Sequence, residues 1–262
     1  MKLIRNLPNI LTLFNLFLGC MAVVYMFNDH MIIVETQSDM LIDMGEIQLA
    51  SYCIFLAAFI DFFDGFIARA LRVESALGAQ LDSLADMVTF GFVPGLILFE
   101  LLAKSYYASY AAFDYPTLFY AIGFVLTICA AIRLGKFNID TRQKTTFHGM
   151  PTPAMAIFVA ALPLIILRDE AGLETALNNK WILMAVIILL SYFMVSDIPM
   201  LSFKVQSLKF DQNQWLFGLL LLVIVILIFT LFIAHTIFLC IPIIIIAYIL
   251  LSITKNIVEH GI

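Results

Sequence analysis

Residues 61–86 read DFFDGFIARALRVESALGAQLDSLAD, and the rest of the chain is organised around this stretch. The first half of the stretch continues an apolar run that begins at Ile47, in a chain of which only 13% of the residues are charged. Burying an unpaired charge in apolar surroundings is costly, so carboxylates placed here need a compensating charge. The stretch holds four of them within 26 residues: Asp61, Asp64, Asp82 and Asp86.

Helical spacing predicts how these acids are arranged. Residues three or four apart share one face of an α-helix, so Asp61 and Asp64 project together from one helix and Asp82 and Asp86 from the next. If the two helices pack side by side, the four carboxylates face one another. Small residues in the same stretch would let the helix backbones approach each other or a ligand closely. These are Gly65, Ala68 and Gly78.

Divalent cations are the expected compensation. A charged residue near the centre of a bilayer costs about 2.5–3.5 kcal/mol, so four would cost on the order of 10 kcal/mol. Oxygen-seeking Mg²⁺ or Mn²⁺ would offset that cost, and two such ions roughly 3.5–4 Å apart are a common clamp for phosphoryl displacement. The alternatives are pairing with nearby bases, of which Arg69 and Arg72 are the closest in sequence, or an ion pathway.

Composition identifies the kind of protein. The chain has 262 residues, is 63% hydrophobic and has a mean hydropathy of +1.03, which indicates an integral membrane protein. Its net charge of −5 gives no reason to expect a nucleic-acid partner. The first apolar stretch follows Lys2 and Arg5 and runs to Phe27, long enough to span, so we expect a retained helix and not a cleaved signal.

The apolar pattern predicts an all-α, polytopic membrane bundle of about eight transmembrane helices. A helix needs about 20 apolar residues to cross roughly 30 Å of hydrocarbon. The fifth helix is expected to be short, and a tight turn around His235 joins the last two. The predicted runs lie near 8–27, 47–70, 80–103, 117–138, 153–168, 181–200, 215–234 and 236–253.

The distribution of bases predicts the orientation. With both termini in the cytoplasm, eleven Lys and Arg residues lie inside and only Lys104, Arg168 and Lys180 lie outside. This asymmetry is the one that the positive-inside rule favours. The four aspartates then converge in the cytoplasmic leaflet, where a site can take a lipid from the membrane and a polar substrate from the cytosol.

The pattern D-x2-D-G-x2-A-R-x8-G-x3-D-x3-D, from Asp61 to Asp86, resembles the signature of the CDP-alcohol phosphatidyltransferase family, with all eight fixed positions matched. The resemblance implies that the four aspartates hold two Mg²⁺ or Mn²⁺ ions and that Asp86 is also the general base. It further implies a nucleotide site on the same two helices. Its residues would be Asp61, Gly65, Ala68, Arg69 and Gly78.

The first apolar run opens with Pro8, Asn9 and Thr12. A similar Pro-Asn-x-x-Thr element lies close to the bound nucleotide in the family, so the resemblance implies nucleotide contact by Asn9 and Thr12. Helix capping or packing explains the same residues, because Asn and Thr favour the first turn of a helix. Both interpretations stay open here.

A second set of motifs looks like the phosphatidylserine synthase branch of the family. They are RLGKFN at 133–138, FHGMPTP at 147–153 and VSDIPM at 195–200, so the resemblance covers residues 5–210. It implies transfer of the phosphatidyl group from CDP-diacylglycerol to the hydroxyl of L-serine, giving phosphatidylserine and CMP. It also implies an enzyme of the bacterial cytoplasmic membrane, and it makes a homodimer plausible.

Basic side chains in these motifs are candidates for acceptor binding. Arg133 and Lys136 would lie at the cytosolic mouth and could receive a phosphate or the serine carboxylate, for which the planar guanidinium of Arg suits a two-point contact. Topology anchors that reach to lipid headgroups are the alternative. Asp197 could cap a helix, pair with a base or bind the serine ammonium, and the sequence does not choose.

The motifs divide the chain into a catalytic bundle, residues 1–210, and two additional helices, residues 211–262. The last two helices contain almost nothing ionisable, so we expect lipid-facing scaffold or an oligomer surface. Three rival functions remain. A relative could use glycerol 3-phosphate or inositol phosphate as acceptor, a cation-coupled transporter could place acids in its helices, and a scaffold could retain degenerate chemistry.

Overall fold

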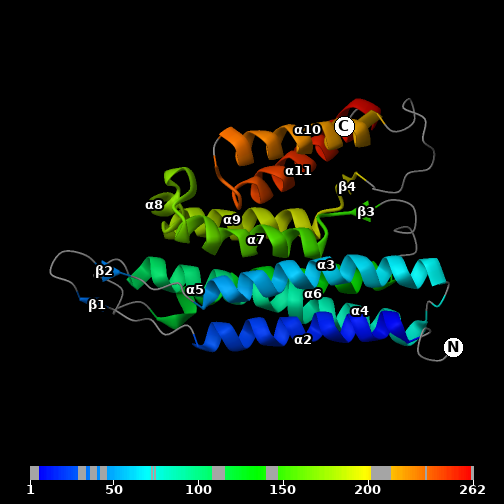
Figure 1. Cartoon of the computed structure of the whole chain (residues 1–262), viewed down its shortest axis with the longest axis horizontal. Coiled ribbons are helices and arrows are strands. Elements are labelled where there is room, and N and C mark those ends of the chain that lie inside the picture. The colour runs from blue at the N-terminus through cyan, green and yellow to red at the C-terminus, as the bar shows by residue number, and fades with distance from the viewer. Residues whose placement is uncertain are drawn as a thin grey trace.

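The fold is that of a computed structural model, which describes residues 6–28, 34–35, 40–41, 46–71, 73, 75–107, 116–139, 147–201, 214–233 and 235–260. Within these ranges the chain is almost entirely helical (Figure 1). The α-helices are α2 Leu7–Asn28, α3 Ile47–Leu71, α4 Ala76–Asp86, α5 Val93–Tyr107, α6 Phe124–Ile139, α7 Thr152–Leu167, α8 Glu174–Leu177, α9 Lys180–Val195, α10 Gln214–Ile228 and α11 Cys240–His260.

Shorter elements link these helices. Two π-helical segments continue α4 and α10, and they are η1 Met87–Phe92 and η8 Phe229–Ile233. Three 3₁₀ turns are η3 Thr117–Phe119, η4 Ala121–Gly123 and η6 Glu170–Gly172. Two antiparallel pairs of two-residue strands complete the described part, and they are β1 Val34–Glu35 with β2 Met40–Leu41, and β3 Phe147–His148 with β4 Pro199–Met200.

Each of the eight predicted apolar runs forms a helix. Six helical segments in the described residues are long and apolar enough to cross a membrane, while α7 and α9 are shorter apolar helices of 16 residues each. Two predicted runs differ clearly from the helices: the eighth was expected at 236–253 but α11 spans Cys240–His260, and the sixth was expected to reach residue 200 but α9 ends at Val195. Ser196 adopts an extended conformation there, and β4 follows.

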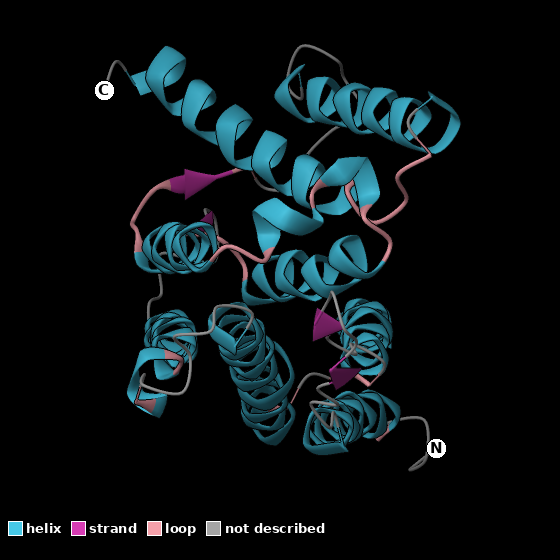
Figure 2. Cartoon of the chain, turned by 90° about the vertical axis from the view of Figure 1, so that its left-hand side faces the viewer, coloured by secondary structure: helices cyan, strands magenta, loops and turns pink. Residues whose placement is uncertain are grey.

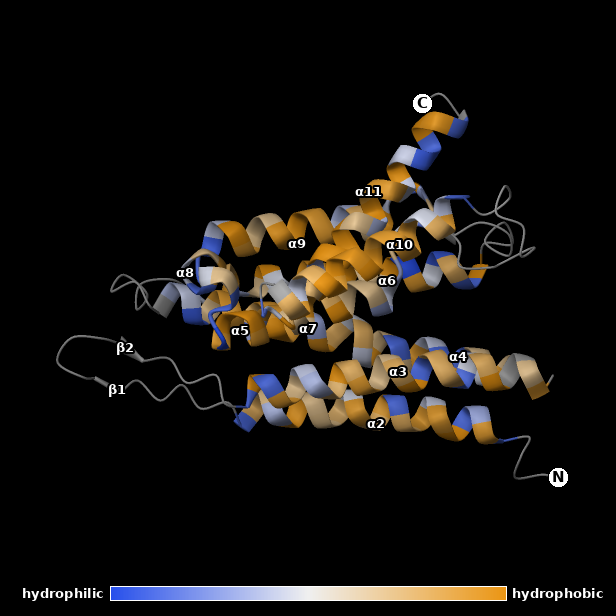
Figure 3. Cartoon of the chain, turned by 45° about the horizontal axis from the view of Figure 1, so that its top comes forward, coloured by the Kyte–Doolittle hydropathy of each residue, from blue (hydrophilic) through white to orange (hydrophobic). Residues whose placement is uncertain are grey.

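The bundle is built around α7. Ten consecutive residues, 157–166, are almost all buried, and α7 contacts α3, α5, α9 and α11. Figure 2 looks along most of the helices and shows α10 and α11 lying across one side of the bundle. Most residues of α9 and α10 are hydrophobic, whereas hydrophilic residues interrupt α2, α3 and α4 (Figure 3). The helices that carry the acidic stretch are thus visibly more polar than α9 and α10.

One end of the bundle carries α4, β3 and β4, and both chain termini lie at that same end (Figure 1). The opposite end carries the β1–β2 pair and α8. There the buried Glu170 accepts hydrogen bonds of 2.8–3.1 Å from the backbone N–H groups of Ile237, Phe238 and Leu239, just before α11. The expected turn at His235 is present, with a φ of 52°.

A π-helical turn directly follows Asp86. In η1 the N–H of Val93 bonds to the carbonyl of Val88, five residues back. Pro94 has no N–H to offer the preceding turn, which favours such an irregularity, and Thr127 Oγ1 donates to the Gly91 carbonyl at 3.0 Å. The helix therefore widens near Gly91 and Pro94 without breaking, and α4, η1 and α5 make one continuous span.

The β3–β4 pair joins the start of α7 to the end of α9. Gly149 has a φ of +72°, its N–H donates to the Ile198 carbonyl at 2.9 Å, and the Met150 N–H donates to the Phe193 carbonyl at 2.9 Å. A Cβ atom on Gly149 would lie 2.6 Å from the Met194 carbonyl oxygen. Only glycine fits this position, both for its φ and for the close approach.

Candidate active site

Helices α3 and α4 bring three of the predicted acids together. Asp61, Asp64 and Asp82 each offer a carboxylate oxygen that lies within 4.8 Å of the others. Asp64 is buried, and the other two are partly exposed. Oxygen ligands at this separation suit a hard divalent cation, because carboxylates are the donors that Mg²⁺ and Mn²⁺ prefer.

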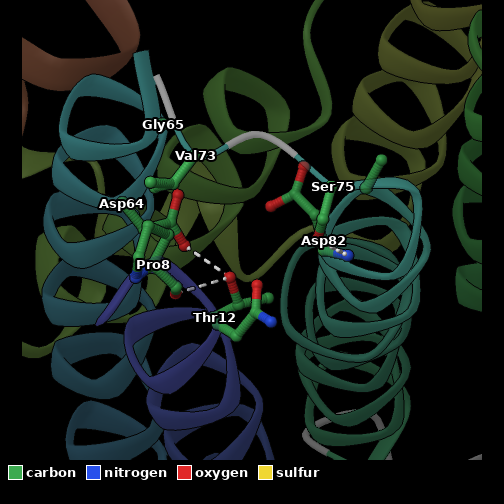
Figure 4. A pocket seen from close by; sticks show the side chains of 10 residues that line it. Pro8, Thr12, Asp64, Gly65, Val73, Ser75 and Asp82 are labelled. Atoms are coloured by element: carbon green, nitrogen blue, oxygen red, sulfur yellow. Dashed lines mark hydrogen bonds between the residues drawn. The ribbon is translucent and has the colours of Figure 1, made fainter. Parts of the chain in front are cut away.

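Helix α2 supplies a partner for one of these acids. Thr12 Oγ1 lies 3.0 Å from Asp64 Oδ2 and 3.1 Å from the Pro8 carbonyl oxygen, as Figure 4 shows. A threonine hydroxyl has one proton, so it donates to one of these two acceptors at a time. Because α2 packs along α3, this contact fixes the Asp64 side chain from the neighbouring helix.

A cavity of about 200 Å³ opens beside this contact, and we call it the α2 cavity. Gly78 brings α4 close to the start of α2, since a Cβ atom there would lie 2.8 Å from Asn9 Oδ1. Ser75 caps α4 by accepting a hydrogen bond from the Gly78 N–H at 3.0 Å. The cavity is lined by Pro8, Asn9, Thr12, Asp64, Gly65, Val73, Ser75, Gly78, Ala79 and Asp82.

A second cavity, of about 310 Å³, borders the same acids, and we call it the α6 cavity. Asp64, Gly65 and Asp82 line both cavities. The acidic group therefore stands between two spaces with otherwise different walls. The rest of the α6 cavity is lined by Asp61, Phe62, Ser83, Asp86, Arg133, Leu134, Phe137, Pro151, Thr152 and Pro153.

Asp86 lines the α6 cavity but is outside the group of three acids. Its Oδ1 atom is buried and has no hydrogen-bond partner among the residues that the structure describes. A buried carboxylate oxygen without a partner requires an explanation, and a bound ion or a proton received from a substrate provides one. The donor set as a whole fits divalent cations.

Arg133 is the cation that faces these acids across the α6 cavity. Its side chain is buried, and Nη1 donates to Thr152 Oγ1 over a long 3.4 Å. Nε has no partner within the described part of the chain. A guanidinium with a donor to spare in a polar cavity can bind a carboxylate or a phosphate in a planar, two-point contact.

Lys136 lies one turn further along α6 and has a different environment. Its Nζ donates to the Val195 carbonyl at 3.4 Å and pairs with Asp197 at 3.9 Å. Both side chains are well exposed, so the ion pair contributes at most about 1 kcal/mol. Of the three roles left open for Asp197, pairing with a base is the one observed, and Lys136 is not part of the cavity wall.

The side chains of two predicted nucleotide residues lie outside the described part of the structure. These residues are Ala68 and Arg69 of α3. The predicted alternative, pairing of the acids with Arg69 or Arg72, lies outside the described residues. Gly65 and Gly78 line the α2 cavity together with Asn9 and Thr12. Asp61, which was also predicted to contact the nucleotide, lines the α6 cavity and not the α2 cavity.

Some residues of the site were not predicted. Thr152 contacts Arg133 and is almost fully buried, and its position between two prolines in FHGMPTP was the available signal. Ser83 lines the α6 cavity and hydrogen-bonds with Asn138 at 3.0–3.1 Å. Asn15 is fully buried one turn beyond Thr12, and neither amide atom has a partner in the described residues. No sequence pattern marks that burial.

These observations define the class first: a helical integral membrane protein with a carboxylate site suited to divalent cations, between two cavities at one end of the bundle. Within that class, the chain belongs to the CDP-alcohol phosphatidyltransferase family, whose model matches residues 5–195. The resemblance carried by the acidic stretch is thereby confirmed. Helices α10 and α11 lie beyond the matched region.

Curated relatives share the same family. The chain is 31% identical over 168 residues to a CDP-diacylglycerol–serine O-phosphatidyltransferase of Bacillus subtilis. The aligned residues make up 62% of this chain and 80% of that protein. A Helicobacter pylori enzyme of the same name is 29% identical over 217 residues, 82% of this chain and 78% of that protein. An archaetidylserine synthase of Methanothermobacter thermautotrophicus is 27% identical over 148 residues, 56% and 57% of the two chains.

Proposed function

We propose that this chain transfers the phosphatidyl group from CDP-diacylglycerol to the hydroxyl of L-serine, giving phosphatidylserine and CMP. The observation that carries the proposal is the group of Asp61, Asp64 and Asp82 between two cavities. Such an arrangement suits a displacement at phosphorus, in which donor and acceptor approach the reacting centre from different sides. The names of the bacterial relatives support serine as the acceptor.

In this proposal two Mg²⁺ or Mn²⁺ ions are held by Asp61, Asp64 and Asp82, with Asp86 as a further ligand. When bound, such ions neutralise the charge of the diphosphate as it shifts to the leaving group. The chain's own contribution is to keep the carboxylates in place. Thr12 does so directly for Asp64, with its hydroxyl 3.0 Å from the carboxylate.

The α2 cavity is the proposed place of the cytidine nucleotide. Gly65 lines this cavity without a side chain, Gly78 lets α4 approach Asn9 closely, and Asn9 and Thr12 supply polar side chains. Asp61, Ala68 and Arg69 complete the proposed nucleotide residues by their positions in the family pattern. The lipid chains of the donor would extend into the membrane from the same end of the bundle.

The α6 cavity is the proposed place of serine. Arg133 binds the serine carboxylate, and Lys136 attracts the amino acid at the outer rim. Asp86 takes the proton of the serine hydroxyl, and the freed oxygen forms a bond to the phosphorus that carries diacylglycerol. The bond from that phosphorus to the CMP oxygen breaks, and CMP leaves. Direct displacement is the simplest route, because no cysteine or histidine is among the described residues that line either cavity.

The proposed setting is a bacterial cytoplasmic membrane with eight spanning helices, both termini in the cytoplasm and the site in the cytoplasmic leaflet. The charge asymmetry of the loops supports this orientation, and so does the position of both termini at the end of the bundle that carries α4 (Figure 1). Residues 1–210 form the proposed catalytic bundle and residues 211–262 the additional helices. A homodimer in the membrane is part of the same proposal.

The test is CMP release by the purified protein in lipid nanodiscs with CDP-diacylglycerol and Mg²⁺ or Mn²⁺. L-serine, glycerol 3-phosphate and inositol phosphate are compared as acceptors. Serine-dependent CMP release that a chelator abolishes supports the proposal. Release with another acceptor alone rejects serine and keeps the acidic site, whereas no release with any acceptor rejects the transferase reaction for this chain.

A further inference from the structure

Helix α11 carries a line of polar side chains on an otherwise apolar helix. Tyr248, Ser252 and Asn256 are spaced four residues apart, so they share one helical face. Tyr248 and Ser252 are buried, and Asn256 is partly buried. We call these three residues the α11 stripe. Polar side chains buried in a membrane helix need hydrogen-bond partners, and the partners found here are informative.

The α11 stripe binds the backbone of β4 and the residue after it. Tyr248 Oη donates to the Leu201 carbonyl at 3.1 Å, and Ser252 Oγ accepts from the Leu201 N–H at 3.1 Å. Asn256 Nδ2 donates to the Pro199 carbonyl at 2.7 Å. Both backbone groups of Leu201 are thus satisfied by side chains of α11. This short segment has little support of its own, because β4 is only two residues long.

The segment that α11 holds leads to the wall of the α6 cavity. Phe147 pairs with Met200 and His148 with Pro199, and the Gly149 N–H donates to the Ile198 carbonyl. The next residues along the chain, 151–153, line the α6 cavity. Thr152 among them accepts the hydrogen bond of Arg133. A continuous series of hydrogen bonds and short chain segments therefore connects α11 with Arg133.

Tyr248 also approaches the cavity more directly. Its phenol lies close enough to the Arg133 guanidinium for the two side chains to interact electrostatically. Helix α11 packs against both α7 and β4, so its position is fixed on each side of the wall. The matched family region ends at residue 195, which leaves the whole stripe outside it.

We propose that the α11 stripe positions the Pro151–Pro153 wall and Arg133, and thereby sets the affinity of the site for its acceptor. Tyr248, Ser252 and Asn256 are positioning residues, since they act through β4 and the wall. The last two helices are then part of the acceptor site and not only scaffold. This inference rests on the proposed function for the identity of the acceptor, serine.

The kinetic test uses variants that lack a single hydroxyl group and otherwise change the shape of the side chain little. In Tyr248→Phe and Ser252→Ala the apparent KM for serine should rise about threefold or more, and about tenfold in the double variant, from the loss of one or two net hydrogen bonds. The KM for CDP-diacylglycerol and kcat should stay within about twofold, because the α2 cavity and the acids are untouched. A purely structural role would lower the amount of folded enzyme and leave the serine KM unchanged.

Thr254→Ala is the matched control. Thr254 lies on the same helix, is exposed, and its hydroxyl donates to the Leu250 carbonyl of its own helix at 2.8 Å. Its substitution removes a hydroxyl from α11 without touching β4. The serine KM of this variant should equal that of the wild type. An equal rise in Thr254→Ala and Ser252→Ala would overturn the inference.

Hydrogen exchange of backbone amides tests the same inference without activity. In Ser252→Ala the Leu201 N–H loses its acceptor, so exchange should quicken at Leu201, and also at Gly149 and Met150, relative to wild type and Thr254→Ala. Unchanged exchange at residues 147–153 in the double variant overturns the positioning role, as does faster exchange with an unchanged serine KM. If wild-type protein releases no CMP with serine, the proposed function fails, and the exchange result still decides whether α11 holds the wall.

Discussion

The hydroxyl of Thr12 in α2 lies 3.0 Å from a carboxylate oxygen of Asp64 in α3, although the two residues are 52 positions apart. This contact links the first helix to the acidic group. It also gives Thr12 two possible roles, holding Asp64 and touching a nucleotide in the α2 cavity. The first of these roles can be tested separately through the metal dependence of the reaction.

Thr12→Val should lower the apparent affinity for the metal ion more than it changes the maximal rate. The substitution keeps the shape of the side chain and removes the hydroxyl, which costs about 1 kcal/mol, or roughly fivefold in apparent metal affinity. The measurement is CMP release as a function of Mn²⁺ concentration. Thr12→Ser keeps the hydroxyl and should restore the wild-type curve. A wild-type curve for Thr12→Val would mean that Asp64 does not need this partner.

Asp86→Asn should abolish turnover and leave the protein folded. Loss of a general base typically costs 10²–10⁴-fold in rate, and the buried Oδ1 of Asp86 has no hydrogen bond to lose among the described residues. CMP release and thermal unfolding in nanodiscs check the two parts. Glu174→Gln is the control, because this exposed acid lies in α8 at the opposite end of the bundle. Residual turnover near the wild-type rate would remove Asp86 from the reaction.

Metal removal should stop the reaction reversibly. EDTA is expected to abolish CMP release, and added Mn²⁺ or Mg²⁺ to restore it, because Asp61, Asp64 and Asp82 stand close together and Arg133 is the only base among the described residues that line the two cavities. Titration with Mn²⁺, followed by electron paramagnetic resonance, should give two bound ions per chain. Asp61→Asn or Asp82→Asn should bind fewer ions and lose activity. Full activity in the presence of EDTA would be incompatible with the proposed site.

Arg133→Ala should raise the apparent KM for serine by about tenfold or more, the expected cost of a lost charge-assisted contact to a carboxylate. Lys136→Ala should have a much smaller effect, because Lys136 pairs with Asp197 outside the cavity wall. Initial rates at varied serine concentration distinguish the two. Arg168→Ala removes a base at the opposite end, where Arg168 lies over the Phe238 ring, and should leave the serine KM unchanged. Equal effects of Arg133→Ala and Lys136→Ala would contradict the assignment.

Gly149→Ala should strongly destabilise the protein. A Cβ atom there combines a positive φ with a distance of 2.6 Å to the Met194 carbonyl oxygen. Gly172→Ala is the matched control, because Gly172 has nearly the same φ, +69°, and no atom within 4 Å of its Cβ position. The control should cost only the backbone strain, about 1–2 kcal/mol, and the difference between the variants in thermal unfolding measures the close approach. Equal losses would mean that the β3–β4 turn tolerates a side chain.

The sequence allowed the helices and the acidic motif to be predicted. Helical periodicity is local, so four residues of spacing are enough to place Asp61 with Asp64 on one face. Long apolar runs likewise predict helices without knowledge of their neighbours. The family pattern from Asp61 to Asp86 needed no tertiary information, and the comparison with the family model confirmed it.

The end of α9 and the shape of the span after Asp86 were harder to predict. Hydropathy continues through Ile198 and Met200, but Ser196 turns the chain into a strand that pairs with β3. The widened turn of η1 depends on Pro94 together with a hydrogen bond from Thr127 of another helix. Contacts between distant segments are absent from a local pattern.

The sequence by itself therefore determined the class of protein, the helices and the acids that share a face. Only the tertiary structure decided which side chains meet. Asp86 lies outside the group of three acids, Arg133 lies in the wall of the α6 cavity and Lys136 lies outside that wall. Helix α11 packs against β4. The physical reason is that the rotation of a helix about its axis, and the neighbours it meets, follow from the packing of the whole bundle, whereas the spacing along one helix follows from its own geometry.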